Sequence, residues 1–154
     1  MRYILALVTL AAVSVFVHAQ APGAPPAPTS PVSAVTFVGH DKVVAALAKG
    51  GPLVSGSDVL VQGSHREQPG GVEVHDHEMD VIYVVDGTAT LVTGGKMVGG
   101  KNTRPGQWLG TDITGGAAQR LVKGDVIVVP AGIPHWFKEV PGPISYYVVK
   151  VIKP

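Results

Sequence analysis

Short apolar runs recur along most of this 154-residue chain, and glycine or proline follows many of them. Within the runs, apolar and polar residues alternate or β-branched residues follow one another, which is typical of strands. The pattern predicts strands at residues 34–38, 59–66, 72–77, 80–85, 88–93 and 144–152. Short strands separated by turn residues, with little helix between them, indicate an all-β sandwich or barrel.

One segment has a helical pattern. Asp41 is placed to act as an N-cap, and Gly50 with Gly51 would end the helix. The apolar positions on one face are Val43, Val44 and Leu47. We therefore expect a two-turn helix at residues 42–49 that covers one face of a sheet.

Two turn signals predict hairpins. The Gln-Pro-Gly-Gly sequence at residues 68–71 would join the strand at 59–66 to the strand that begins at Val72. Asp86 and Gly87 form a dipeptide that favours tight hairpin loops, so we expect the strand at 88–93 to return beside the one before it.

The run at residues 80–85 is apolar on both faces, which predicts that neither face contacts water. One face would line the interior. A second subunit related by a two-fold axis would cover the other, so we predict a homodimer. The alternative is that the glycine-rich excursion at residues 94–116 folds back over that face.

This excursion has short expected strands at residues 107–109 and 111–113. It reads as a long β-hairpin. It lies between residues 73–80 and 124–135, which contain the candidate metal ligands described below, so it could also cover the mouth of a barrel as a lid. Trp108 would be the apolar contact of such a lid; the alternative is that Trp108 is a core residue.

The first residues are typical of a secretory signal peptide, since Arg2 precedes an apolar run at residues 4–17 and Val17-His18-Ala19 then forms the cleavage site. We predict a signal peptide at residues 1–19, a Pro- and Ala-rich linker at 20–33 and a single domain at 34–154. The mature chain would be secreted or periplasmic. Cleavage would also leave no membrane segment, because the apolar run belongs to the leader.

The net charge and the cysteine content limit the kinds of partner and cross-link that we expect. The net charge of the whole chain is +1 at pH 7, and removal of Arg2 with the leader would bring it near zero. A balanced chain gives no electrostatic reason to expect binding to nucleic acid or to an anionic membrane. The chain has no cysteine, so an exported form has no disulfide to support its core.

The residues that favour metal chemistry fall into two groups. Glu73, His75 and His77 alternate along an expected strand, so their side chains would share one face, and Asp80 follows a short reversal. His135 follows a β-branched run and the tight Pro-Ala-Gly-Ile-Pro turn at 130–134. Imidazoles and carboxylates from two separate hairpins suit a divalent transition metal. The alternative for the histidines is a hydrogen-bonded pair in the core.

These motifs resemble those of the cupin superfamily. Gly124, Pro130, Gly132 and His135 match its second motif, and Glu139 stands where that motif has Asn. The first motif is matched more loosely, with Asp80 in place of the family's Glu and Gly87 six residues later. The resemblance covers about residues 59–152. It implies a jelly-roll β-barrel with one short N-terminal helix and a bound metal, and cupins often pair as dimers.

The resemblance leaves the histidine register open. If Glu73 and His75 fill the His-x-His positions, the spacing to Asp80 fits the family, and His77 lies in the hairpin loop. This is our preferred register. If His75 and His77 fill them, the spacing to Asp80 is too short. His77 therefore stays a candidate ligand beside the preferred set.

Two functional hypotheses follow. The first is a metal-dependent enzyme on a small organic molecule, an oxygenase, lyase or isomerase, which uses iron, manganese, nickel or zinc. Glu139 or Glu78 would then serve as general base. The second is an exported module that binds a small ligand or a metal without catalysis, and fold does not separate the two.

Overall fold

Nearly all of the regular structure in the described part of this chain is β-sheet. The computed structural model describes residues 28–153. One helix, α1 (His40–Lys49), precedes the strands. The strands are β1 Gly51–Ser55, β2 Val59–Arg66, β3 Val72–His75, β4 Glu78–Asp86, β5 Ala89–Thr93, β6 Lys96–Val98, β7 Lys101–Arg104, β8 Gln107–Gly110, β9 Asp112–Thr114, β10 Ala117–Leu121, β11 Val126–Val129, β12 His135–Glu139 and β13 Ile144–Ile152.

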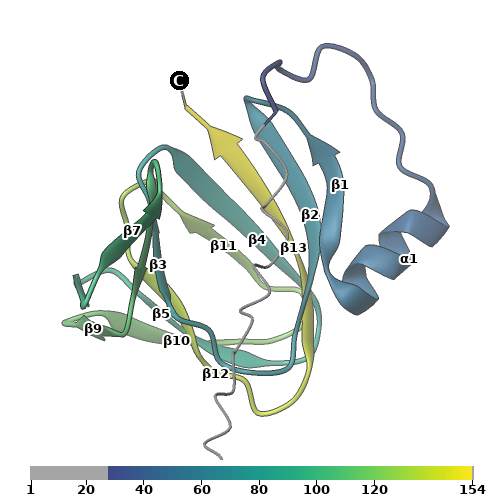
Figure 1. The fold of residues 1–154 in the computed structure, drawn as a ribbon. Coiled ribbons are helices and arrows are strands. Elements are labelled where there is room, and N and C mark those ends of the chain that lie inside the picture. Colours follow the sequence, from purple (N-terminus) through teal and green to yellow (C-terminus); the bar gives the residue numbers. More distant parts are fainter. Residues whose placement is uncertain (1–27, 154) are drawn as a thin grey trace, which may run out of the picture.

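Two antiparallel sheets face each other (Figure 1). The first has the strand order β1-β2-β13-β4-β11, and the second has the order β10-β5-β12-β3-β8-β7. Strands β6 and β9 form a separate two-stranded ribbon. The arrangement confirms the predicted jelly-roll barrel with one short helix before it.

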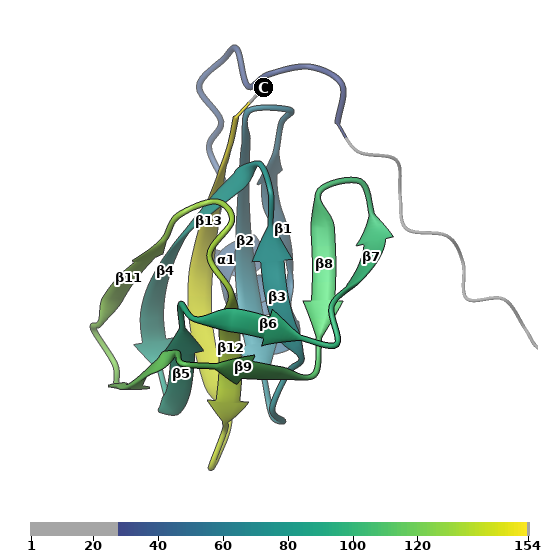
Figure 2. The same ribbon diagram turned by 90° about the vertical axis from the view of Figure 1, so that its left-hand side faces the viewer.

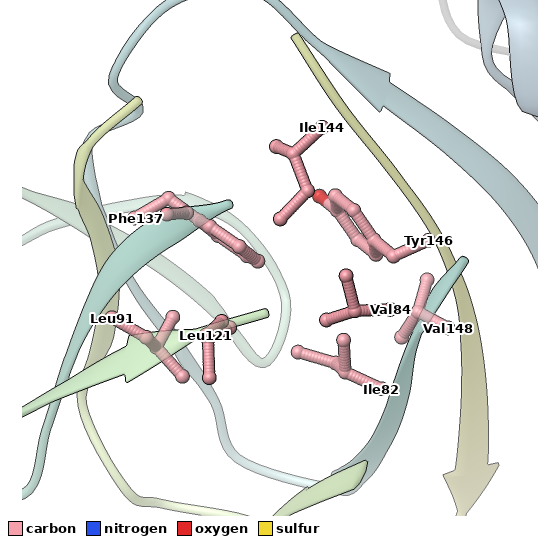
Figure 3. Close-up of a cluster of buried hydrophobic side chains, with 9 residues drawn as sticks. Ile82, Val84, Leu91, Leu121, Phe137, Ile144, Tyr146 and Val148 are labelled. Atoms are coloured by element: carbon pink, nitrogen blue, oxygen red, sulfur yellow. The ribbon is translucent and has the colours of Figure 1, made fainter. Parts of the chain in front are cut away.

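The hydrophobic core is a cluster of buried side chains from both sheets (Figure 3). Ile82 and Val84 of β4 meet Leu91 of β5, and Phe137 stacks on Tyr146 with ring centroids 5.0 Å apart. On β4 these buried residues alternate with Val81 and Tyr83, which face outward, as a half-buried strand requires.

Helix α1 packs on the outer side of β2 through small residues. Ala46 is its buried residue, and a side chain at Gly63 would come within 2.7 Å of the Ala46 backbone. The predicted apolar face was therefore wrong in part, because Val44 is exposed and Ala46 is the buried residue instead. The predicted N-cap was also wrong: Gly39 occupies that position without a side-chain cap, and Asp41 lies in the first turn.

Both predicted hairpins were wrong. Strand β2 pairs with β1 and β13, and β4 pairs with β11 and β13, so the turns after β2 and β4 carry the chain into the opposite sheet. Gly87 does have a left-handed φ of 85°, but a side chain there would lie 2.2 Å from the Pro143 carbonyl oxygen. Gly87 is therefore required where the backbone passes close to Pro143, and the local sequence does not show which strand β5 pairs with.

The segment before the helix is also irregular. Residues 34–38 form no strand, and Val35 and Phe37 are exposed. The predicted signal peptide lies outside the described residues. The end of the predicted linker contacts the barrel, because Ser57 N–H donates to the Ser30 carbonyl oxygen and Val32 N–H donates to Asp58.

The excursion at residues 94–116 forms the four strands β6 to β9, which confirms its β character. Strands β7 and β8 extend the six-stranded sheet beside β3 (Figure 2). None of these residues covers the outer face of β4, where Tyr83 remains 44% exposed. Trp108 lies at the surface and donates from Nε1 to Asp76. Within residues 28–153, no helix is long and apolar enough to cross a membrane.

Candidate metal centre

The two candidate histidines lie at strand ends that meet in one sheet. His75 is the last residue of β3 and His135 the first of β12, and both are buried. His135 lies directly opposite Glu73 in the β12–β3 pairing. The imidazole centroids are 5.0 Å apart and the rings are inclined by 56°.

The turn before His135 holds the two strands together. Gly132 has a φ of 79°, a conformation that favours glycine, and its N–H donates to the His75 carbonyl oxygen over 2.8 Å. Ile133 N–H donates to the Pro130 carbonyl oxygen and closes the turn. The turn predicted from the sequence therefore fixes the backbone beside both imidazoles.

Each ring is oriented through its Nδ1 atom. The His75 Nδ1–H donates to Gln107 Oε1, and the His135 Nδ1–H donates to the Ile133 carbonyl oxygen over 3.1 Å. These acceptors place the proton on Nδ1 in the neutral ring, so each Nε2 keeps its lone pair. The His75 Nε2 atom is buried and has no hydrogen-bond partner. A buried, unpaired nitrogen held in this way is what a metal ligand requires.

Two carboxylates face the Nε2 atoms. Asp80 Oδ2 lies 3.6 Å from Nε2 of both His75 and His135, and Glu73 Oε2 lies 3.6 Å from His75 Nε2. Asp80 is buried, whereas Glu73 is partly exposed. We call Glu73, His75, Asp80 and His135 the metal cluster. Two imidazole nitrogens and two carboxylate oxygens fit a divalent transition metal.

Lys150 adds a fixed positive charge beside the cluster. Its Nζ lies 2.8 Å from Asp80 Oδ1 and 2.9 Å from Glu78 Oε2. His75, Glu78 and Asp80 form a second group of possible ligands, but the ammonium of Lys150 already forms an ion pair with each of its two carboxylates. The group of Glu73, His75 and His135 has no such cation and is the better place for a metal.

The charges and the burial shift three pKa values. Burial lowers the pKa of His75, but contact with the Asp80 carboxylate outweighs it, and the pKa is raised. Burial raises the pKa of Asp80, but His75 and Lys150 outweigh it, and the pKa is lowered. The pKa of His135 is lowered, chiefly because its ring is buried.

Two predicted site residues lie elsewhere. His77 is exposed in the turn after β3, because that strand ends at His75, so it does not share the face of Glu73 and His75. Glu139 is exposed at the end of β12 and accepts a hydrogen bond from the Thr90 hydroxyl over 2.6 Å. The structure brings together Glu73, His75, Asp80 and His135, and it leaves His77 and Glu139 outside.

Sequence reasoning missed two residues of the site. Gln107 reaches His75 from β8 in the excursion and also donates from Nε2 to Glu78 over 2.8 Å. No local pattern indicates this role. Lys150 gave a signal, because it is the one charged residue in the apolar strand β13, and a buried lysine needs a carboxylate.

A cavity of about 270 Å³ adjoins the metal cluster. Its walls include Glu73, Asp80, Ile82, His135, Phe137, Tyr146, Val148 and Lys150. His65 and Arg66 of β2 also line it. The volume is slightly below the usual range for drug-sized ligands, roughly 300–1,000 Å³, so the space suits a small molecule. Glu78 and Glu139 are not among the lining residues.

Comparison with solved structures supports the architecture. A Bacillus halodurans protein is 15% identical, with a TM-score of 0.56, and the match covers 82% of this chain and 88% of that chain. The cupin domain of Cnp3 from Schizosaccharomyces pombe is 11% identical, with a TM-score of 0.50, and the match covers 67% of this chain and 63% of that chain. At these identities the likeness concerns the fold alone.

Sequence comparison identifies the family. Comparison with curated proteins found no match. The cupin family profile matches residues 52–149, which is more than half of the chain and includes the whole metal cluster. Together with the jelly-roll barrel and the paired motifs, this match shows that the chain belongs to the cupin family.

Proposed function

We propose that this chain is an exported, metal-dependent cupin enzyme that acts on a small organic molecule in the barrel cavity. The observation that carries the proposal is the meeting of the Nε2 atoms of two buried histidines with two carboxylates beside that cavity. The expectation of export comes from residues 1–19 of the sequence. It is checked by the mass of the chain recovered from the periplasm or the medium.

Glu73, His75 and His135 would hold the metal, and Asp80, whose Oδ2 lies 3.6 Å from both Nε2 atoms, would be a further candidate ligand. A divalent metal in such a site supplies Lewis-acid or redox chemistry at open coordination positions. Iron, manganese, nickel and zinc all suit the donor set. The candidate reactions are accordingly those of an oxygenase, a lyase or an isomerase.

The other residues of the site prepare it for this chemistry. Gln107 and the Ile133 carbonyl oxygen keep the proton on Nδ1 of each histidine. Lys150 holds the Asp80 carboxylate in the charged form and in a fixed position. Apolar residues of the core, among them Ile82 and Phe137, limit water on the inner side of the cavity. Neither Glu78 nor Glu139 enters the proposal as a base, because neither lines the cavity.

Elemental analysis of the purified chain tests the metal assignment. We expect about one metal ion per chain, and we expect His135→Ala to lose most of it because one buried nitrogen ligand is removed. His40→Ala is the matched control, since His40 is exposed at the start of α1. Full metal content in His135→Ala would contradict the assignment.

A turnover screen with each reconstituted metal then tests catalysis. Each metal form is incubated with a panel of small organic molecules, and product formation and ligand affinity are measured in parallel. Turnover that is lost in His135→Ala supports the enzyme. Affinity without turnover for any metal would favour a binding module instead.

A further inference from the structure

The cations that line the cavity differ in whether they have a partner. Lys150 contacts two carboxylates at distances below 3 Å. His65 Nε2 lies 3.5 Å from Glu67 Oε1, and its Nδ1 contacts the Ser145 hydroxyl. Arg66 also lines the cavity, but within residues 28–153 no carboxylate oxygen lies within 4 Å of its guanidinium. Arg66 is thus the cation on this wall that lacks a counter-charge.

Packing holds the Arg66 guanidinium in place. Its Cζ lies 5.0 Å from the centroid of the Phe137 ring, which in turn stacks on Tyr146 (Figure 3). A side chain at Gly70 would come within 2.5 Å of Nη1, so the guanidinium lies close against the Gly70 backbone. An arginine over an aromatic face is oriented for a planar, bidentate partner along its edge.

One atom of this guanidinium is unsatisfied. Arg66 Nε is buried and has no hydrogen-bond partner within the described residues. A buried charged donor without a partner destabilises the protein, and an anionic ligand that accepts from it removes that cost. The absence of an internal carboxylate, the orientation and the unpaired Nε all indicate an external acceptor.

The position of Arg66 relative to the metal cluster sets the size of that acceptor molecule. Phe137 lies two residues beyond His135 on β12, so both side chains project from the same face. Two residues of a strand span about 7 Å. A molecule that reaches from the metal cluster to Arg66 therefore has the length of a short carbon chain.

We propose that Arg66 binds a carboxylate of the ligand while the other end of the ligand lies at the metal cluster. The proposal rests on the metal-dependent function and adds to it the substrate class: small organic anions with a carboxylate at the end distant from the metal. Arg66 is a ligand-binding residue in this scheme, and it does not contact the metal cluster.

Calorimetric titration of the metal-loaded protein tests the proposal. The probes are malonate, succinate, glutarate and adipate, each compared with its own monoamide. Both members of a pair offer one carboxylate to the metal, so the pair differs only in the charge of the distal group. We expect the best-fitting diacid to bind about tenfold or more tightly than its monoamide, because a charge-assisted hydrogen bond is lost in the amide.

Variants separate Arg66 from general charge effects. Arg66→Gln should reduce the ratio of diacid to monoamide affinity to within roughly threefold, and Arg66→Lys should keep part of it because the charge remains. Arg120→Gln is the matched control for Arg66→Gln. Arg120 is exposed on β10, and its substitution changes the net charge by the same amount. Metal content should be unchanged in all three variants.

Several outcomes would overturn the proposal. These are equal affinity of the wild-type protein for diacid and monoamide, failure of every diacid to bind, and an unchanged ratio in folded Arg66→Gln. The wild-type comparison stands even where that variant does not fold. The same titrations are repeated on metal-free protein, where a diacid preference that depends on Arg66 still supports the proposal. Absence of metal from the purified wild-type protein would therefore contradict the proposed function alone.

Discussion

Lys150 Nζ lies 2.8 Å from Asp80 Oδ1 and 3.1 Å from Asp80 Oδ2, so the buried carboxylate of the metal cluster already has a cation beside it. Asp80 therefore serves two partners, the ammonium on one side and the two imidazole Nε2 atoms on the other. A metal that binds here competes with Lys150 for the same charge. This competition makes Lys150 a residue that sets metal affinity without being a ligand.

Lys150→Met should raise metal affinity and lower the stability of the metal-free protein. Loss of the ammonium leaves Asp80 and Glu78 without their cation, which we expect to cost about 1–3 kcal/mol of unfolding free energy. Added metal should restore more stability in the variant than in the wild type. Chelator competition and thermal unfolding with and without metal measure both effects. Lys123→Met, at an exposed turn, is the control, and weaker metal binding in Lys150→Met would contradict the argument.

Glu73→Gln should weaken metal binding more than His77→Gln does. Glu73 Oε2 faces His75 Nε2 at 3.6 Å, whereas His77 is exposed in the turn after β3. Competition titrations with a chromophoric chelator rank the two variants. The reverse ranking would assign the ligand pair to His75 and His77.

Gln107→Ala should reduce metal affinity by roughly 10- to 100-fold, the usual effect of removing a group that orients a metal ligand. Gln107 accepts from His75 Nδ1–H and donates to Glu78, so its loss frees the ring to rotate. The control is Gln119→Ala, since Gln119 is exposed on β10. Equal metal affinity in the two alanine variants would show that Gln107 does not position His75.

Metal affinity should rise with pH through the pKa of His75. Burial lowers the pKa of His75, but Asp80 outweighs it, and the pKa is raised. The metal-free protein therefore keeps this proton to a higher pH than an ordinary histidine does. The pKa of His135 is lowered, so that ring is already neutral there. Binding should therefore release about one proton in this range and fewer at higher pH. Calorimetry in buffers of different ionisation enthalpy counts the protons, and pH-independent affinity would refute the prediction.

The outer face of the five-stranded sheet should mediate a homodimer. Tyr83 on β4 lies between Val126 on β11 and Tyr147 on β13, and both Tyr83 and Val126 are exposed. Such a face left in water costs about 25 cal/mol for each Å² of apolar area, which a two-fold partner would recover. Light scattering at micromolar concentration should give a dimer.

A charge introduced on that surface tests the interface. Val126→Lys should convert the dimer to a monomer, because it places an ammonium in the apolar face. Val98→Lys, at an exposed valine of β6 in the separate ribbon, should not. A monomeric wild-type chain would mean that this face needs no partner.

Local sequence was sufficient for those parts of the site that depend on single turns. Pro130 and Gly132 specify a turn whose backbone bonds are made within a few residues or to the adjacent strand, so His135 could be placed from the sequence. The strand β13 was likewise predicted at residues 144–152, because β-branched and aromatic residues make up most of it. In both cases short-range rules determine the result.

Partner choice over long distances was not predictable in this way. Asp86 and Gly87 do reverse the chain, but β5 joins the opposite sheet because its buried residues complete the core there. Lys150 and Asp80 are 70 residues apart and meet only through the register of β13 on β4. The roles of Arg66 and Gln107 were also not predictable. Each depends on a residue of another strand, Phe137 for Arg66 and His75 for Gln107, that is distant in the sequence.

The hydrogen bond from Gly132 N–H to the His75 carbonyl oxygen bears on how the site would choose its metal. His75 and His135 are sixty residues apart in sequence, and closing a loop of that length costs about 3–4 kcal/mol of chain entropy. The Gly132–His75 backbone hydrogen bond and the β3–β12 pairing offset that entropy cost during folding, before an ion binds. The ligands consequently form a rigid frame, and ions whose preferred bond lengths and angles differ from this frame are disfavoured by strain.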